Sequence, residues 1–238
     1  MLTMQRVLLI LPVVLPIIFW AAYHYHKDRH LPEPPFNLLL CFVLGLLAAA
    51  ISKLMYAGLE PLGLRFDAWA LAADDPLGLF LYSMLAIGPI EESAKMLPFL
   101  LVVIRLRAFD EVLDGIVYAS FIALGYALAE NLHYLDLLSP LEAAARGFAG
   151  PVVHIVFAST WAYWVSRARL SNLPAAKAAS LGFLLAAFLH GLYDYLVLLH
   201  PVAALPVAAA LIVGIWIWRL RLMHRLQQQA LKSNELEL

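Results

Sequence analysis

From Leu79 to Ile104 the chain reads LFLYSMLAIGPIEESAKMLPFLLVVI, an apolar run of membrane-spanning length that contains two adjacent glutamates and a lysine. Placing Glu91, Glu92 or Lys95 in hydrocarbon costs a few kcal/mol or more unless the charge is paired, neutralised or facing a wet cavity. Ionisable side chains inside a membrane are therefore functional-site hypotheses from the outset. The remaining sequence must supply their partners.

The composition is too apolar for a protein with a water-exposed surface. Of the 238 residues, 63% are hydrophobic and 14% are charged, and the mean hydropathy is +0.82. We expect an all-α, polytopic transmembrane bundle that forms one integral membrane domain over residues 1–238, with the lipid bilayer as its surroundings. The net charge of -1 argues against nucleic acid as a partner. A single cysteine, Cys41, excludes an intrachain disulfide and a cysteine metal cluster.

Seven apolar runs have roughly the 20-residue length that a membrane-spanning helix needs, with eight as the alternative count. The predicted spans are Val7–Tyr25, Phe36–Ala57, Leu79–Ile104, Val112–Leu132, Pro151–Val165, Ser180–Leu199 and Val202–Trp218. Turn signals such as Asp74-Asp75-Pro76 separate them. The residues from 220 to 238 are expected to form a cytoplasmic tail that leaves the membrane as a fraying helix.

Charge asymmetry between the loops orients this bundle. With seven spans, 11 of the 16 lysines and arginines fall on one side. The positive-inside rule makes that side cytoplasmic. We therefore expect the N-terminus outside and the C-terminus inside.

The third span is expected to consist of two helical pieces, because Gly88-Pro89 and Pro98 both disturb the backbone hydrogen-bond ladder. Glu91 and Glu92 then lie in the first turn after the break, where the helix dipole favours negative charge. Lys95 can fold back onto them. Since two neighbouring carboxylates rarely both ionise in low dielectric, one could serve as a base and the other as an acid or orienting group. The alternative is a structural ion pair that caps a broken helix.

The fourth span carries acidic residues at both ends. Asp110, Glu111 and Asp114 lie in its first turn, where carboxylates suit a helix start without any special role. Glu130-Asn131 lies near the other end. This pair is either part of a helix interface or a site pair that orients a histidine or a substrate amide.

Histidines in the next two spans complete the set of ionisable groups. His154 is either a packing residue or, because it shares the membrane with carboxylates, a functional one. His190 and Asp194 are four residues apart and project from one helical face. A carboxylate one turn away commonly sets the tautomer and orientation of a histidine.

Taken together, these motifs resemble the PrsW family of membrane proteases, within the wider superfamily of CAAX prenyl endopeptidases and bacteriocin-immunity proteins. The resemblance is carried by PIEESAK (89–95), FDExxDGIVY (109–118), GxxxxEN (125–131), His154 and HGxxD (190–194). These motifs lie within an expected protease core of residues 79–200. The CAAX-type relatives have asparagine one turn after the last histidine, where this chain has Asp194, so a donor role does not simply transfer to Asp194.

The resemblance implies a glutamic-type intramembrane endopeptidase. Glu91 would act as general base on a water that His154 helps to hold, and Glu92 would orient groups or shuttle protons. His190 with Asp194 would stabilise the oxyanion. Amide hydrolysis needs such a base and such a donor whatever the family. The expected supporting residues are Lys95, Asp114, Glu130 and Asn131.

The resemblance also implies a setting. It points to the cytoplasmic membrane of a bacterium and to a membrane-protein substrate, which in relatives can be an anti-sigma factor cut on its extracytoplasmic side at the start of a stress response. In the predicted fifth span His154 lies near the outer end, which favours cleavage on that side. No residue of this chain identifies its substrate.

Two alternatives remain open. In the first, proteolysis is metal-assisted, because the Glu, His and Asp residues of the cluster are ligand types that zinc accepts. The sequence has no His-Glu-x-x-His helix and no Gly-x-Ser-x-Gly turn, and the main interpretation needs no cofactor or metal. In the second, the buried carboxylates and histidines serve a proton-coupled transporter. Transporters usually contain internal repeats, and we find none that is convincing.

Overall fold

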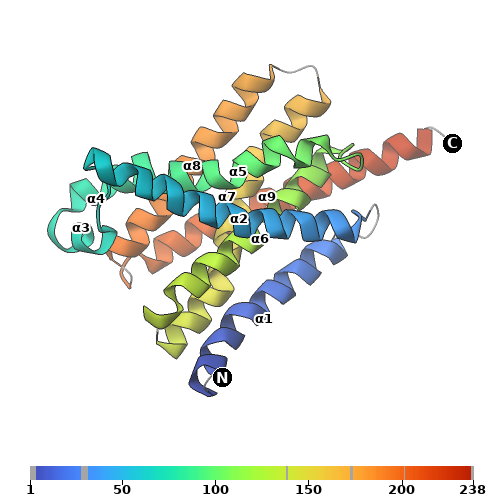
Figure 1. The fold of residues 1–238 in the computed structure, drawn as a ribbon. Helices are drawn as coiled ribbons and strands as arrows, with labels where there is room; N and C mark the ends of the chain where they lie inside the picture. The colour runs from blue at the N-terminus through green and yellow to red at the C-terminus, as the bar shows by residue number, and fades with distance from the viewer. Residues whose placement is uncertain (1–3, 28–31, 138, 172–173, 201, 237–238) are drawn as a thin grey trace.

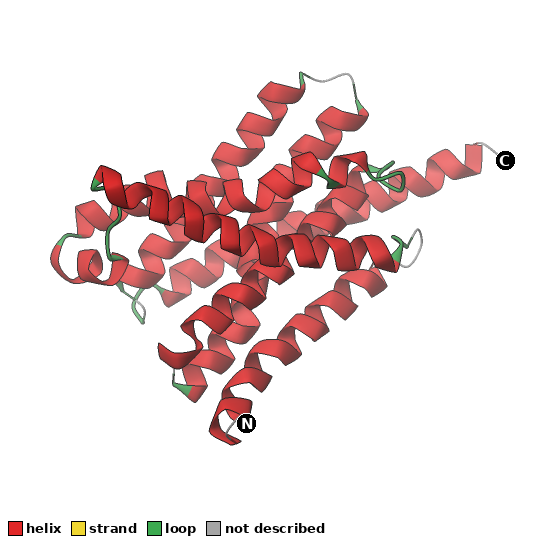
Figure 2. Cartoon of the chain, in the orientation of Figure 1, coloured by secondary structure: helices red, strands yellow, loops and turns green. Residues whose placement is uncertain are grey.

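The computed structural model describes residues 4–27, 32–137, 139–171, 174–200 and 202–236, which form helices joined by turns, without a strand in those ranges (Figure 2). The α-helices are α1 (Met4–Lys27), α2 (Pro35–Leu59), α3 (Ala68–Asp74), α4 (Pro76–Tyr82), α5 (Gly88–Leu101), α6 (Val112–Tyr134), α7 (Pro140–Leu170), α8 (Ala175–Leu199) and α9 (Leu205–Leu236). Short helical turns η1 (Glu60–Leu62), η2 (Ser83–Ile87), η3 (Val103–Arg105) and η4 (Leu135–Leu137) lie between them. The all-α prediction is confirmed.

Within the described residues, five helices are long and apolar enough to cross a membrane. They are α2 with its short extension η1, α6, α7, α8 and α9, and they correspond to five of the seven predicted spans. The first predicted span coincides with α1 and the third with α4, η2 and α5. The protein is thus a membrane-integral helical bundle, and the total of seven spans stays a prediction.

Helix α6 lies at the centre of the bundle, where it packs against α2 on one side and α7 on the other (Figure 1). Glycines permit the close approach of α2 and α6. A Cβ atom at Gly45 would lie 2.0 Å from the Ile122 carbonyl oxygen, and one at Gly125 would lie 2.0 Å from that of Phe42. Nearly all side chains of α6 before Leu128 are buried, so this helix fixes the positions of its neighbours.

The third predicted span is not broken at Gly88-Pro89. The residues before it, Ser83–Ile87, form one π-helical turn, and α5 continues from Gly88 through Pro98 to Leu101. A π turn absorbs an extra residue within a helix and often occurs at functional sites. The two-piece prediction was therefore wrong about the kind of disturbance, although Glu91 does lie in the first turn of α5.

The fifth predicted span began too late. Helix α7 starts at Pro140, because Ser139 and Glu142 form a capping box in which the Ser139 amide donates to Glu142 Oε2 at 2.8 Å. Pro151 therefore lies inside the helix, and His154 is the fifteenth of its 31 residues. His154 thus lies near the middle of α7, and its position does not favour cleavage on the outer side.

The predicted tail is also more regular than expected. Helix α9 continues without interruption from Leu205 to Leu236. Its Arg219 is fully buried and donates to Ser120 Oγ at 2.8 Å and to Ser159 Oγ at 2.7 Å. These contacts fasten α9 to α6 and α7.

Candidate active site

The site depends on a very close approach between the start of α5 and the middle of α8. A Cβ atom at Gly88 would lie 2.1 Å from the Ala187 carbonyl oxygen, and one at Gly191 would lie 2.4 Å from that of Ser83. At both Cβ positions there is room only for the hydrogen atom of a glycine. The backbones therefore meet beside the π turn, and the residues that follow Gly88 face those that precede Gly191.

Glu92 is the centre of a buried hydrogen-bond network. Its Oε1 accepts from Lys95 Nζ at 2.5 Å and lies 2.6 Å from His190 Nδ1, and its Oε2 accepts from Trp161 Nε1 at 2.8 Å. Glu92 and Lys95 are fully buried. The Glu92 carboxylate already accepts two N–H groups, so it is also the acceptor toward His190. We therefore place a proton on His190 Nδ1, which donates to Glu92.

His190 presents its second nitrogen to two other carboxylates. Nε2 lies 3.5 Å from Glu91 Oε2 and 3.4 Å from Asp194 Oδ2, and the ring stacks on Phe157 with centroids 4.9 Å apart. The prediction that Asp194 meets His190 across one turn is supported by this distance. With Nδ1 held by Glu92 and the ring held by Phe157, Nε2 has a fixed direction.

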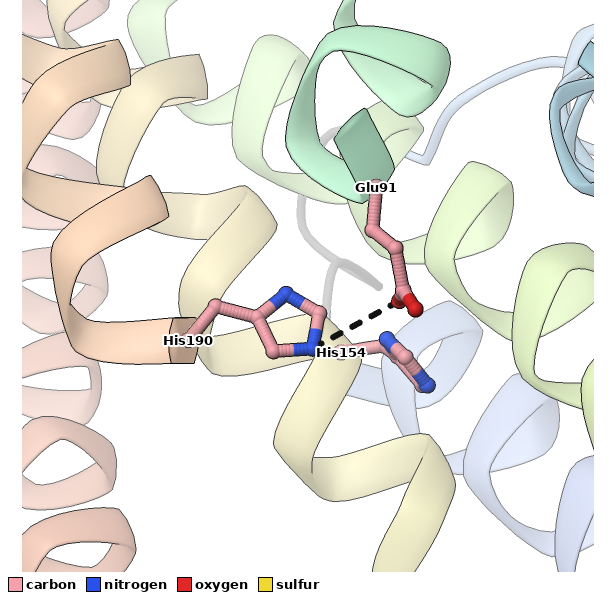
Figure 3. A group of neighbouring side chains, drawn as sticks. All are labelled: Glu91, His154 and His190. Atoms are coloured by element: carbon pink, nitrogen blue, oxygen red, sulfur yellow. Dashed lines mark ion pairs between the residues drawn. The ribbon is translucent and has the colours of Figure 1, made fainter. Parts of the chain in front are cut away.

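Glu91 faces His190, and one of its two carboxylate oxygens accepts no hydrogen bond from the described residues. Its Oε1 accepts from the Tyr56 hydroxyl at 3.5 Å, whereas its buried Oε2 has no hydrogen-bond partner among the described residues. Figure 3 shows Glu91 from α5, His154 from α7 and His190 from α8 pointing toward one another. A buried acceptor without a donor is costly and marks a place where a ligand or reactant can bind.

His154 is held by hydrogen bonds at both ring nitrogens. Lys95 Nζ lies 3.1 Å from Nδ1, and Glu130 Oε2 lies 2.7 Å from Nε2. Because an ammonium group only donates, Nδ1 must accept and the ring proton must be on Nε2, which donates to Glu130. Lys95 thus links His154 to Glu92.

Glu130 and Asn131 belong to this network and are not merely an interface pair. Arg146 Nη2 donates to Glu130 Oε1 at 2.7 Å, and Arg146 Nε donates to Asn131 Oδ1 at 3.1 Å. The Arg146 side chain is 37% exposed, the Glu130 side chain 20% and the Asp194 side chain 23%, whereas Lys95 is fully buried. The network therefore extends from a partly open edge to the interior.

Asp114 lies apart from this cluster. Its carboxylate accepts from the backbone amides of Asp110 at 3.0 Å and Glu111 at 2.7 Å, so it caps the start of α6. Glu130 follows 16 residues later on the same helix, about 24 Å along its axis. Burial, together with the charges of Asp114 and Asp110, raises the pKa of the Glu111 carboxyl beside it.

The structure thus brings together eight of the nine residues that the sequence indicated. They are Glu91, Glu92, Lys95, Glu130, Asn131, His154, His190 and Asp194.

Sequence reasoning missed three participants, Tyr56, Trp161 and Arg146. Trp161 is seven residues after His154, two helical turns along the same face, which is a signal that could have been used. Arg146 lies in the predicted loop between the fourth and fifth spans, because that prediction starts the fifth span at Pro151, whereas α7 begins at Pro140.

The cluster includes a donor set that suits a metal ion. Ligand atoms of Glu91, His154 and His190 all lie within 4.8 Å of one another. One glutamate and two histidines form a common catalytic zinc set, and a carboxylate on the other nitrogen of a ligating histidine, as on His190, is usual. His154 fits less well, because both its nitrogens are engaged and one of them faces the Lys95 ammonium.

Comparison with known proteins identifies the family to which this site belongs. A family model described as "PrsW family intramembrane metalloprotease" matches residues 33–219. The chain belongs to the PrsW family. This match covers α2 through the first half of α9 and includes every residue of the cluster, so the chain is an intramembrane protease.

Curated relatives agree with this assignment. The chain is 28% identical over 214 residues to "Protease PrsW" of Clostridioides difficile (strain 630), covering 87% of each chain. It is 29% identical over 185 residues to "Protease PrsW" of Bacillus subtilis (strain 168), covering 77% of this chain and 79% of the relative. For "Protease PrsW" of Geobacillus kaustophilus (strain HTA426) the identity is 30% over 186 residues, covering 78% and 77%. No solved structure matches the chain significantly.

Proposed function

We propose that this PrsW-family protease hydrolyses a peptide bond of a membrane protein with a water molecule that Glu91 activates. The observation that carries the proposal is the buried Glu91 Oε2, which accepts no hydrogen bond from the described residues and lies 3.5 Å from His190 Nε2. When a general base and a hydrogen-bond donor lie side by side, the base can take a proton from the attacking water while the donor stabilises the carbonyl oxygen that gains charge.

The proposed reaction assigns one task to each side chain. Glu91 takes a proton from water as the water oxygen attacks the carbonyl carbon, and His190 Nε2–H donates to the oxyanion that forms. Glu91 then returns the proton to the leaving nitrogen as the carbon–nitrogen bond breaks. Asp194, at 3.4 Å from Nε2, stabilises the imidazolium form of His190 that can donate.

Glu92 has a different role from Glu91 in this scheme. Both of its oxygens already accept hydrogen bonds, from Lys95, His190 and Trp161. It therefore orients His190 and does not carry protons to the substrate. Of the two roles that the sequence suggested for Glu92, the hydrogen-bond network supports orientation.

Replacing Glu91 tests the proposal directly. Glu91→Gln keeps the shape of the side chain and removes the base, so we expect kcat to fall by roughly 10²- to 10⁴-fold. The measurement is cleavage of a co-expressed single-pass membrane protein, with the amount of enzyme in the membrane as a check on folding. Glu60→Gln changes an exposed glutamate in η1 and is the matched control. Cleavage by Glu91→Gln at the native rate would refute the role of Glu91.

The ligand set supports a second candidate mechanism, in which a metal ion activates the water. Glu91, His154 and His190 would hold the ion, which would supply Lewis-acid activation of water and of the substrate carbonyl. Removal of metal from the purified enzyme distinguishes the two mechanisms. Under the glutamate mechanism we expect activity to survive dialysis against a strong chelator. Loss of activity that added zinc restores would assign the metal mechanism instead.

For the substrate we propose a single-pass protein of the bacterial cytoplasmic membrane. By analogy with PrsW relatives, an anti-sigma factor in a stress response is the first candidate. The buried position of the cluster supports a substrate that enters from the bilayer or its edge. Expression of the native chain, but not of Glu91→Gln, should remove such a substrate from the membrane.

A further inference from the structure

Arg219 is a buried cation whose described partners carry no negative charge. Its side chain is fully buried, in a helix that is apolar and long enough to cross a membrane. Its hydrogen-bond partners in the described part of the chain are Ser120, Ser159 and His24, and none of them is a carboxylate. Because a buried charge without an opposite charge is strongly destabilising, this arginine calls for an anion.

The two serines accept from Arg219 but do not balance its charge. Ser120 Oγ accepts from Nη2 at 2.8 Å, and Ser159 Oγ accepts from Nε at 2.7 Å. Each hydroxyl donates its own proton to the carbonyl four residues earlier, at 2.6 Å for Ser120 and 2.7 Å for Ser159. The Trp216 ring, whose centroid lies 5.3 Å from the guanidinium carbon, adds the attraction of its π face. These neighbours solvate the guanidinium without neutralising it.

Two N–H donors at this place have no acceptor among the described residues. They are Nη1 of Arg219 and Nε2 of His24, and both side chains are fully buried. Arg219 Nη2 lies 3.4 Å from His24 Nδ1, and since a guanidinium only donates, Nδ1 accepts and the ring proton is on Nε2. The two unpartnered donors therefore belong to groups that touch each other, beside a positive charge.

We propose that Arg219 and His24 bind a small inorganic anion of the halide type, with Nη1 and Nε2 as its donors. An anion provides both the counter-charge for the guanidinium and an acceptor for the two N–H groups. Because both side chains are fully buried, the site suits a single small ion and not the phosphate of a lipid headgroup. The ion would join α1 to α9 at the place where Arg219 also contacts α6 and α7.

This anion site lies apart from the catalytic cluster. Helix α7 contributes Ser159 to it, whereas Trp161, which donates to Glu92, lies two residues later. Positions two apart on an α-helix point about 200° apart, so these two side chains lie on nearly opposite sides of α7. We therefore expect the anion to act on the stability of the bundle, which can be measured without a substrate.

Direct binding of chloride is the first test. We expect the purified native chain in detergent to bind one ³⁶Cl⁻ ion saturably. His24→Phe keeps an aromatic ring and leaves Arg219 with both serines, but removes the Nε2 donor, so we expect a Kd at least about 10-fold higher. His26→Phe, at an exposed position of the same helix, is the matched control and should bind as the native chain does. Absence of saturable binding to the native chain, or native affinity in His24→Phe, would refute the site.

The dependence of stability on chloride is the second test. As chloride replaces gluconate at constant ionic strength, the Tm of the native chain should rise, by about 5–10 °C at a chloride concentration 100 times the Kd. Arg219→Gln should lose this dependence, whereas Arg65→Gln, which breaks an exposed ion pair with Glu60, should keep it. A native Tm that ignores chloride would mean that water alone meets these donors and would overturn the proposal. An equal rise in Arg219→Gln would reveal a general salt effect and would also overturn it, and His24→Phe replaces Arg219→Gln if the latter does not accumulate.

Discussion

At the scale of single residues, two adjacent glutamates have unequal surroundings. Consecutive positions on an α-helix point about 100° apart, so Glu91 and Glu92 cannot face the same neighbours. Glu92 receives three N–H donors, whereas Glu91 receives one hydroxyl and its other oxygen accepts no hydrogen bond from the described residues. The order of the pair along the chain decides which glutamate keeps an oxygen without a hydrogen bond.

The hydrogen bond from Trp161 to Glu92 yields a prediction at this scale. Trp161→Phe removes a 2.8 Å donor from a buried carboxylate oxygen, and an unsatisfied buried acceptor costs about 1–3 kcal/mol. We expect a lower thermal unfolding temperature in detergent. We also expect reduced cleavage, because Glu92 is held less firmly and therefore orients His190 less well. Trp69→Phe is the control, since Trp69 is 62% exposed on α3. Native stability of Trp161→Phe would argue against a structural role for this bond.

At the scale of helices, the site exists because α5 and α8 touch at glycines beside a π turn. Ser83–Ile87 shifts the phase of the helix just before Glu91, and its Ser83 carbonyl faces Gly191. A regular α-helix through this segment would rotate the following residues relative to α8. The π turn and the two glycines together determine which face of α5 meets His190.

A methyl group at the contact should separate these helices. In Gly191→Ala the new Cβ would lie 2.4 Å from the Ser83 carbonyl oxygen, so we expect a loss of about 1–3 kcal/mol from overpacking and a large fall in cleavage rate. Gly214→Ala on α9 is the matched control, because no other part of the described chain lies within 4 Å of its Cβ position. That substitution should be neutral or stabilise the helix by up to about 1 kcal/mol. Equal activity of the two variants would contradict the tight-contact argument.

At the scale of the whole molecule, long-range contacts bring several helix ends together. Gln227 of α9 donates to the Lys27 carbonyl at the end of α1 at 2.9 Å. At the start of α2, Asn37 donates to the Tyr118 hydroxyl near the start of α6 at 3.1 Å. The end of α1, the starts of α2 and α6, and the distal half of α9 therefore lie at one end of the bundle.

This arrangement is the one that seven crossings would produce, and it leads to a topology prediction. The charge-rich end should face the cytoplasm, with the N-terminus outside. A green fluorescent protein fused after Leu238 should fluoresce, and alkaline phosphatase fused there should be inactive. Active phosphatase at the C-terminus would reverse the orientation, and the same result at both termini would indicate an even number of crossings.

Much of this molecule could be predicted because the signals are local. Apolar runs, and turn signals that contain proline, predicted most helix positions. At the predicted turn Asp74-Asp75-Pro76, for example, Asp75 caps α4 by accepting from the Gly78 amide at 2.9 Å. The pairings Lys95 with Glu92 and His190 with Asp194 span three and four residues, which is one helical turn. Such contacts need only the period of the helix.

The sequence alone determined that the chain is an all-helical membrane protein, which family it resembles, and which ionisable residues had to find partners. Only the tertiary structure decided that one Glu91 oxygen accepts no hydrogen bond from the described residues, that Arg146 and Trp161 join the network, and that Asp114 does not. The reason is physical: helical period relates residues within about one turn, whereas the contacts of Trp161 with Glu92 and of His190 with Glu92 join positions 69 and 98 residues apart. Those contacts depend on which helix faces meet, and that is set by glycine contacts and a π turn that no local pattern revealed.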